Sequence, residues 1–172
     1  GGGGAVAKDP ERVKFVAAQV KSAEQHPDAE ALLICKVDVG EEEERVVVAG
    51  LSSHMDAKSL EGKMTVCVTN LKPSKMRGVE SKGMLLGLAK EGEFAGLVNP
   101  PVGSGAGDIL KFEGYNSTPD AMMKSKGAVK CFERVIAGMN VDETGAVAFE
   151  GAALVSEGGA RVESTMIGAE VK

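Results

Sequence analysis

Apolar and polar residues follow the two-residue period of β-strands along much of this chain, more than the longer period of helices. Five runs rich in β-branched and other apolar residues predict strands, at residues 13–20, 32–39, 45–51, 64–68 and 83–89. The polar and charged residues 53–61, which precede a glycine, predict a short helix or turn between the third strand and the fourth. This order is that of an oligonucleotide/oligosaccharide-binding barrel, the OB-fold. The predicted fold class is therefore mainly β, with a five-stranded OB-fold barrel.

The C-terminal third of the chain has a different pattern. A connector rich in proline and glycine follows the predicted barrel at residues 99–107. Beyond it, the sequence predicts a helix at about residues 119–136 and two strands, at 146–149 and 161–165. Because this part is short and has few large apolar residues, we expect it to pack on the barrel as an α+β extension. The predicted organisation is a linker or cloning remnant at 1–8, the barrel domain at 9–112 and the extension at 113–172.

The net charge argues against nucleic acid at first sight. The chain has 20 Lys+Arg against 25 Asp+Glu, a formal charge of −5, which is not that of a protein that coats nucleic acid by bulk charge. Between residues 63 and 90, however, six basic residues stand against one acid, Glu80, so the local charge is +5. Charges farther apart than ~8–10 Å are largely screened at physiological salt, so this segment can still bind phosphate. Composition leaves a second interpretation open, in which these lysines only solvate a loop.

Residues 70–84, within this basic stretch, combine cations with neutral donors. A proline and a glycine interrupt them, which predicts a turn-rich loop leading into the fifth strand. Lysine and arginine bind phosphate oxygens, whereas Asn70 and Ser81 can donate to phosphate, ribose or a base edge. Met76 and Met84 fit either the core or a contact with the face of a base. The pattern favours a nucleic-acid interface at the mouth of the barrel.

No group of residues predicts catalysis or a cofactor. His26 precedes a proline in a turn and His54 follows two serines, and neither has a nucleophile or metal ligand at a suggestive spacing. The neighbours Ser53, His54 and Asp56 do not indicate a catalytic triad, because triads assemble across a fold. The glycine-rich stretch 103–107 lacks the Lys-Ser/Thr ending of a phosphate-binding loop. We expect no enzyme activity, no cofactor and no metal site.

The cysteines and the hydropathy pattern indicate the compartment. Cys35, Cys67 and Cys131 are widely spaced among apolar residues, with no Cys-x-x-Cys pair, and we expect buried, reduced thiols. No stretch approaches the ~18 consecutive apolar residues of a membrane span. These features predict a cytoplasmic protein with no membrane partner.

Several motifs, in one order, resemble a known family. They are the His-Pro-Asp-Ala turn at 26–29, the Val-Asp-Val-Gly stretch at 37–40, the run 45–51 and the segment 70–84. Together they are similar to the endothelial-monocyte-activating-polypeptide-like (EMAP-like) tRNA-binding domain, over residues 13–112. That family is an OB-fold barrel that occurs free as a synthetase cofactor or fused to the end of aminoacyl-tRNA synthetases. The C-terminal part resembles the long form of the family.

The resemblance implies a surface that binds tRNA mainly by backbone and shape and assists a synthetase catalytic domain in cis or in trans. In the long form, the extension covers the surface by which shorter relatives pair, which implies a monomer built as a pseudo-dimer. The strands of the candidate binding surface contain no aromatic residue, apart from Phe94 in a predicted loop, which agrees with shape recognition rather than base stacking. The implied tRNA-binding residues are Asn70, Lys72, Lys75, Met76, Arg77, Ser81, Lys82 and Met84.

The chain also departs from the family pattern. The stretch 14–18 lacks the Arg and Gly of the family's first strand, Glu24 and Gln25 replace a basic pair, and residues 41–44 are all glutamates. These departures predict a weaker affinity for tRNA than that of more basic members. They leave one alternative open, a scaffold or cytokine-like signalling domain of a synthetase complex in which protein–protein contact is the main role.

Overall fold

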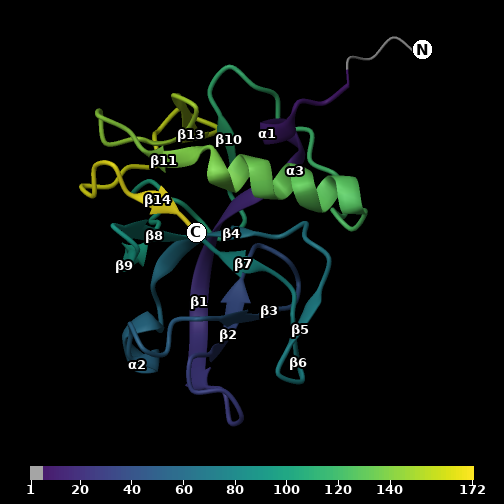
Figure 1. The fold of residues 1–172 in the computed structure, drawn as a ribbon, viewed down its shortest axis with the longest axis vertical. Coiled ribbons are helices and arrows are strands. Elements are labelled where there is room, and N and C mark those ends of the chain that lie inside the picture. The colour runs from purple at the N-terminus through teal and green to yellow at the C-terminus, as the bar shows by residue number, and fades with distance from the viewer. Residues whose placement is uncertain (1–5) are drawn as a thin grey trace.

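The computed structural model describes residues 6–172, in which an N-terminal part and a C-terminal extension share one core (Figure 1). Strands of the N-terminal part occupy the lower half of the view, and α3 with the strands of the extension lies above them. Of the predicted linker, residues 1–5 lie outside the described residues, whereas Lys8 already caps the short helix α1 (Asp9–Arg12). No helix in the described range is long and apolar enough to cross a membrane.

The five strands expected from the β-branched runs are present in the N-terminal part. Their order in the sheet is β3–β2–β1–β4–β7, all antiparallel, with the long strand β1 pairing β2 through one half and β4 through the other. The helical insert α2 lies between β3 and β4, as predicted. The bounds are β1 (Phe15–Gln25), β2 (Leu33–Asp38), β3 (Arg45–Ala49), α2 (Ala57–Leu60), β4 (Met64–Val68) and β7 (Met84–Leu85).

Closure of this sheet into a barrel is not observed. Among residues 6–172, no ladder of backbone hydrogen bonds joins β3 to β7, although a backbone bond from Lys82 N to Val46 O (2.8 Å) joins β3 to the segment just before β7. β7 has only two residues, and Gly83 just before it packs close to its neighbours, where a Cβ would lie 3.1 Å from Cys67 Sγ and 3.2 Å from Val47 Cγ2. The expectation of a five-stranded barrel is correct in strand order only.

The predicted fifth strand, 83–89, divides into two. β7 pairs with β4, whereas β8 (Gly87–Lys90) pairs with β9 (Glu93–Leu97), a strand that the sequence pattern does not predict. Leu86 lies between them and bonds to both sides, from its N–H to Val66 O (3.0 Å) and from Val98 N to its own carbonyl (2.9 Å). The chain therefore leaves one ladder and joins another at Leu86.

The extension continues the same sheet. β10, the last strand of the N-terminal part, pairs with β1 and with β13, and β14 pairs with β8, so strands of the extension connect β10 to β8. The connector 99–107 precedes β10, as expected. The bounds are β10 (Ile109–Phe112), α3 (Lys126–Ala137), β11 (Met139–Val141), β12 (Val147–Phe149), β13 (Ala152–Ser156) and β14 (Glu170–Val171).

Two predictions for the extension are wrong in their bounds or type. The helix begins at Lys126, with the Ser125 hydroxyl accepting from Ala128 N (3.1 Å), and residues 119–125 precede it in non-helical conformation. The predicted strand 161–165 contains only isolated bridges, from Arg161 and Glu163 to other segments. Both errors arise where long-range contacts, rather than local pattern, decide the backbone.

The largest hydrophobic cluster joins the two parts. Phe15 and Phe112 pack edge to face, with ring centroids 5.4 Å apart, and Met123, Val135 and Leu154 of the extension complete the same buried cluster. A second cluster lies within the N-terminal part, around β1, β2 and α2. The extension packs on the N-terminal part as expected, and its core is not separable from it. The three cysteines are buried and free, and burial raises the pKa of Cys35 to about 11.

Candidate nucleic-acid interface

The turn-rich loop predicted at 70–84 contains a β-hairpin, which we call the basic hairpin. β5 (Ser74–Met76) and β6 (Val79–Ser81) pair antiparallel as a separate two-stranded sheet, at the lower right of Figure 1. Arg77 and Gly78 form the turn with positive φ angles of 52° and 86°. Two-residue turns with both φ positive match the twist of antiparallel strands, and glycine adopts such a φ without strain. The turn places Arg77 at the tip of the hairpin.

Arg45, the first residue of β3, closes the base of the basic hairpin. Its Nη1 donates to the carbonyl oxygens of Thr69 (2.7 Å) and Lys82 (2.9 Å), which lie on the two sides of the hairpin. Its Nε and Nη2 donate to the two carboxylate oxygens of Glu41, each at 2.7 Å. These hydrogen bonds lower the pKa of Glu41 and hold the plane of the guanidinium. One glutamate of the acidic run thus orients the arginine that holds the basic hairpin.

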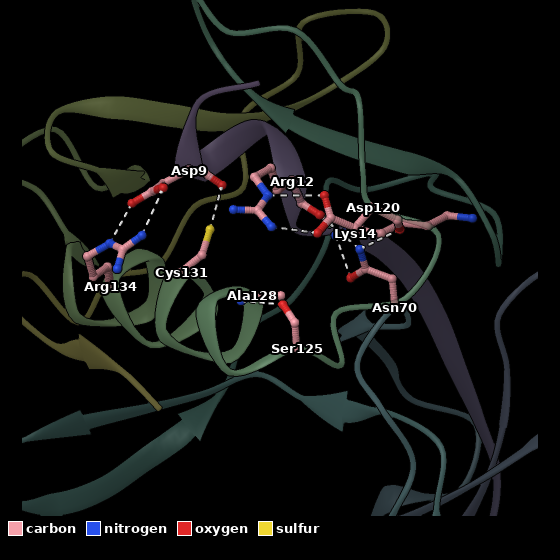
Figure 2. Close-up of polar contacts among 9 residues, drawn as sticks. All are labelled: Asp9, Arg12, Lys14, Asn70, Asp120, Ser125, Ala128, Cys131 and Arg134. Atoms are coloured by element: carbon pink, nitrogen blue, oxygen red, sulfur yellow. Dashed lines mark hydrogen bonds and ion pairs between the residues drawn. The ribbon is translucent and has the colours of Figure 1, made fainter. Parts of the chain in front are cut away.

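Asn70 lies at the start of the segment but faces the protein (Figure 2). It is 4% exposed, and its Oδ1 accepts from Lys14 N (2.9 Å). Its Nδ2 donates to the carbonyl oxygens of Arg12 (2.8 Å) and Asp120 (3.0 Å). Both amide donors and the acceptor are therefore used within the fold. The sequence pattern predicts a free donor here, whereas the structure shows a buried residue that ties the segment to the chain before β1 and to the extension.

Figure 2 also shows two ion pairs, one beside Asn70 and one at the opposite side of the view. Arg12 donates to both carboxylate oxygens of Asp120, at 3.1 and 2.8 Å, and Arg134 of α3 donates to both oxygens of Asp9, at 2.7 and 3.2 Å. The hydrogen bond from Arg134 lowers the pKa of Asp9. These ion pairs join α1 to the extension. Asn70, at the start of the basic segment, is therefore hydrogen-bonded to both parts of the fold.

Ser81, at the end of β6, also bonds within the protein. The residue is 5% exposed; its hydroxyl oxygen accepts from Val48 N (3.0 Å), and its O–H group donates to Gly83 O (3.1 Å). The hydroxyl thus bridges the basic hairpin to β3, in the gap where a barrel ladder would run. Like Asn70, Ser81 is a predicted contact residue that the structure places in a supporting position.

His26 supports the far end of the basic hairpin. Its ring is 2% exposed, with Nε2 3.1 Å from Met76 O and Nδ1 3.0 Å from Asp28 N. The backbone N–H of Asp28 can only donate, so Nδ1 accepts and Nε2 carries the proton that bonds to Met76 O. The sequence pattern places His26 in a turn before a proline, and the described structure gives this buried ring a supporting role. The pattern does not predict that its partner is the hairpin.

The remaining predicted residues are accessible. Lys72, Lys75, Arg77 and Lys82 are all exposed, and only Lys82 has an ion-pair partner among the described residues, Glu80 at 4.0 Å. Met76 and Met84 are half-buried. The eight residues predicted from the sequence therefore divide into an exposed cationic group, two half-buried methionines, and the two buried supports Asn70 and Ser81.

A groove of about 530 Å³ runs beside the basic hairpin. β3, β7, β8 and β9 contribute its other walls, and both methionines line it. Phe94 also lines it and lies on strand β9, not in the loop that the sequence predicts. Its ring stacks on that of His54, with centroids 4.8 Å apart and planes inclined by 24°. The sequence pattern does not reveal this aromatic wall, because the two rings are 40 residues apart in the chain.

Comparison with known families decides what kind of domain this is. The family model described as "Putative tRNA binding domain" matches residues 15–108, which is more than half of the chain. The chain belongs to this tRNA-binding family. The match includes β1 through the connector before β10 and contains the whole basic hairpin. The resemblance to the EMAP-like domain, as it occurs in tyrosyl-tRNA synthetases and their multifunctional cofactor, is confirmed.

Curated relatives of this tRNA-binding domain are parts of larger proteins. The chain is 43% identical over 129 residues to the cytoplasmic tyrosine–tRNA ligase of Danio rerio, covering 73% of this chain and 24% of the ligase. It is 37% identical over 118 residues to the aminoacyl tRNA synthase complex-interacting multifunctional protein 1 of Mus musculus, covering 69% of this chain and 38% of that protein. The chain thus spans about a quarter to two fifths of the length of these relatives.

Solved structures resemble the tRNA-binding domain over different lengths. The C-terminal domain of Plasmodium vivax p43 matches 94% of this chain and 98% of its own, with a TM-score of 0.86 and 26% identity. A MetRS related protein from Pyrococcus horikoshii matches 56% of this chain and 88% of its own, with a TM-score of 0.52 and 35% identity. The first match extends over the extension, and the second covers little more than half of the chain.

Proposed function

We propose that this domain binds tRNA largely through the phosphate backbone and overall shape, and that it assists an aminoacyl-tRNA synthetase to which it is fused or bound. The observation that supports the proposal is the basic hairpin. Its exposed cations stand on a segment that hydrogen bonds fix at its start, base and tip. Cations in a fixed array meet phosphates with a smaller loss of conformational entropy than mobile ones.

In this proposal the predicted site residues have two roles. Lys72, Lys75, Arg77 and Lys82 contact phosphate, because they are exposed and positively charged. Asn70 and Ser81 are positioning residues, because all of their hydrogen bonds hold the segment in place. The methionines line the groove beside the hairpin and contact the nucleotide through ribose or base.

The benefit to a synthetase is a higher local concentration of tRNA. A tethered binding module lets the catalytic domain work at a lower bulk concentration of its substrate, without contributing chemistry of its own. The domain itself acts without a cofactor or metal and without a membrane partner. The cytoplasm fits this role, since the tyrosine ligases named above are cytoplasmic and the three thiols here are buried and free.

We further propose that the extension takes the place of a second copy, so that the domain, at 9–112 and 113–172, acts as a monomeric pseudo-dimer. The supporting observation is the ladder that runs from β1 through β10, β13, β12, β11 and β14 to β8, which covers surface of the N-terminal part with strands of the same chain. Light scattering should give the mass of one chain at micromolar concentration. A stable dimer would contradict the pseudo-dimer.

Direct binding of unfractionated tRNA to the wild-type chain tests the function itself. At about 50 mM salt, where phosphate contacts are stronger than at physiological salt, the chain should bind fluorescently labelled tRNA and raise its fluorescence anisotropy. A folded chain that does not bind under these conditions would refute the proposal and favour the scaffold alternative, in which protein–protein contact is the main role.

A further inference from the structure

We propose that the groove beside the basic hairpin binds the base of one unpaired nucleotide of the RNA, while the cations at its rim hold the adjoining phosphate. This inference rests on the proposed function and deepens it, because it names a feature of the RNA that duplex shape alone does not provide. The recognition it describes is a stacking contact, added to the phosphate contacts of the basic hairpin.

The aromatic wall is the first argument for a planar occupant. Phe94 lies against Gly87 of β8, where an added Cβ would come 3.3 Å from Phe94 Cε2, so the absence of a side chain at this glycine lets the ring lie close to the strand. The exposed His54 ring then covers Phe94 in a nearly parallel stack. A flat ring extends such a stack favourably, and nucleobases are the planar groups that RNA offers.

The methionines make another part of the groove lining soft and apolar. Met76 comes from β5 of the basic hairpin and Met84 from β7, and both are half-buried where they line the groove. Thioether side chains adapt to the face or edge of an aromatic ring. The groove, with a volume of about 530 Å³, has room for one nucleotide.

The charge of the lining selects an anion. Among the described residues that line the groove none is Asp or Glu, although the chain as a whole has more acids than bases. Lys72 and Lys172 both line it. A site with cations at its rim, an apolar interior and one stacked wall is complementary to a nucleotide, which joins a phosphate to a flat ring. The few polar groups of the lining, such as the Ser74 hydroxyl, provide little means to distinguish one base from another.

The test compares two RNAs that differ only in one unpaired end. The first is a blunt RNA stem-loop, and the second carries three unpaired nucleotides with 2-aminopurine in the middle. The wild-type chain should bind the second RNA about tenfold more tightly, since stacking one base on an aromatic group is worth that order of affinity. The fluorescence of 2-aminopurine should fall on binding, as it does when the ring stacks.

His54→Ala is the variant that tests the wall, because His54 is exposed and its removal leaves the core intact. This variant should lose most of the preference for the unpaired end and bind the blunt RNA as the wild type does. His54→Phe, which keeps a stacking ring, should retain the preference. Lys58→Ala, an exposed change on α2, serves as the matched control.

The failures are distinguishable. If the wild type binds both RNAs equally, and 2-aminopurine stays bright, the groove holds no base, although the proposed function stands. If neither RNA nor tRNA binds, the proposed function fails and the inference fails with it. A third result would assign the groove to a protein ligand instead of a nucleotide. In that case an acidic peptide would bind in the groove of the wild-type chain, whereas the unpaired nucleotides would not bind there.

Discussion

The double variant Lys75→Glu/Arg77→Glu should bind tRNA about a hundredfold more weakly than the wild type at about 100 mM salt, a loss near 3 kcal/mol. Both side chains are exposed on the basic hairpin, one on β5 and one at the turn, and each exchange replaces an attraction to phosphate with a repulsion. Neither side chain has an ion-pair partner among the described residues, but Lys75 lies opposite Glu80 in the hairpin, so the exchange adds a like-charge pair that costs on the order of 0.2–1 kcal/mol of stability. Titration of labelled tRNA, with thermal unfolding of the same samples, measures both effects.

A charge-matched control separates the hairpin from net charge. Lys58→Glu/Lys111→Glu changes the total charge by the same amount, at exposed positions on α2 and β10 that lie away from the basic hairpin in Figure 1. Its affinity for tRNA should stay within about threefold of the wild type, since charges beyond a Debye length are screened. Equal weakening by the two double variants would show that overall charge, and not the hairpin, governs binding.

Asn70→Ala should destabilise the fold by about 3 kcal/mol, which lowers the melting temperature by ~10 °C in a chain of this size. The substitution leaves the N–H of Lys14 and the carbonyls of Arg12 and Asp120 without the partner that they have in Figure 2. Unpaired polar groups in a buried site carry the full cost of their desolvation. Thermal unfolding followed by circular dichroism measures the change.

Asn70→Ala also tests whether Asn70 stabilises the fold or contacts tRNA directly. Below its melting temperature, Asn70→Ala should bind tRNA within a few-fold of the wild type, because the side chain is buried and faces the protein. Asn140→Ala is a suitable control, since Asn140 is exposed on β11 and should tolerate the change with a melting temperature within about 2 °C of the wild type. An unchanged melting temperature together with lost tRNA binding would show that Asn70 contacts RNA after all.

Local pattern predicts the first four strands well. The β-branched runs give β1 to β4 and the insert α2 in the correct order, because alternation with a period of two is a property of each segment by itself. β9 is not predicted, since Glu93–Leu97 contains a glycine and an alanine and has little of the β-branched composition on which the pattern depends. It becomes a strand by pairing with β8.

The helix of the extension shows why bounds depend on distant residues. Pro119 and Asp120 have the composition of a helix start, but Asp120 pairs with Arg12, 108 positions earlier, and the helix begins six residues later behind Ser125. The isolated bridge of Met123 with Leu71 holds the intervening residues in a non-helical path. No window of local sequence contains these partners.

The candidate site is predictable in composition but not in burial. Residue types identify the segment 70–84 as cationic and rich in donors, and the exposed cations agree with that. Whether Asn70 and Ser81 face solvent depends on Lys14, Asp120 and Val48, which the fold brings to them from other elements. For the same reason, the local sequence pattern does not predict the supporting roles of Arg45 and His26 or the stacked rings of His54 and Phe94.

The structure also shows how the excess of acidic residues in the chain bears on tRNA binding. Glu41 is engaged with Arg45 and supports the basic hairpin, so one of the four consecutive glutamates is not a free negative charge. Glu42, Glu43 and Glu44 remain exposed beside it. We therefore expect moderate affinity for tRNA and a steep response to salt rather than absence of binding.

The salt dependence of tRNA binding by the wild-type chain tests the central claim most directly. Three to four phosphate contacts predict a slope between about −2 and about −3.6 in a plot of log affinity against log salt, at ~0.7–0.9 per phosphate. Between about 50 and 200 mM salt, the affinity should then fall about 15- to 150-fold. A slope near zero with measurable binding would contradict recognition through phosphate, and no binding at about 50 mM salt would contradict the account as a whole.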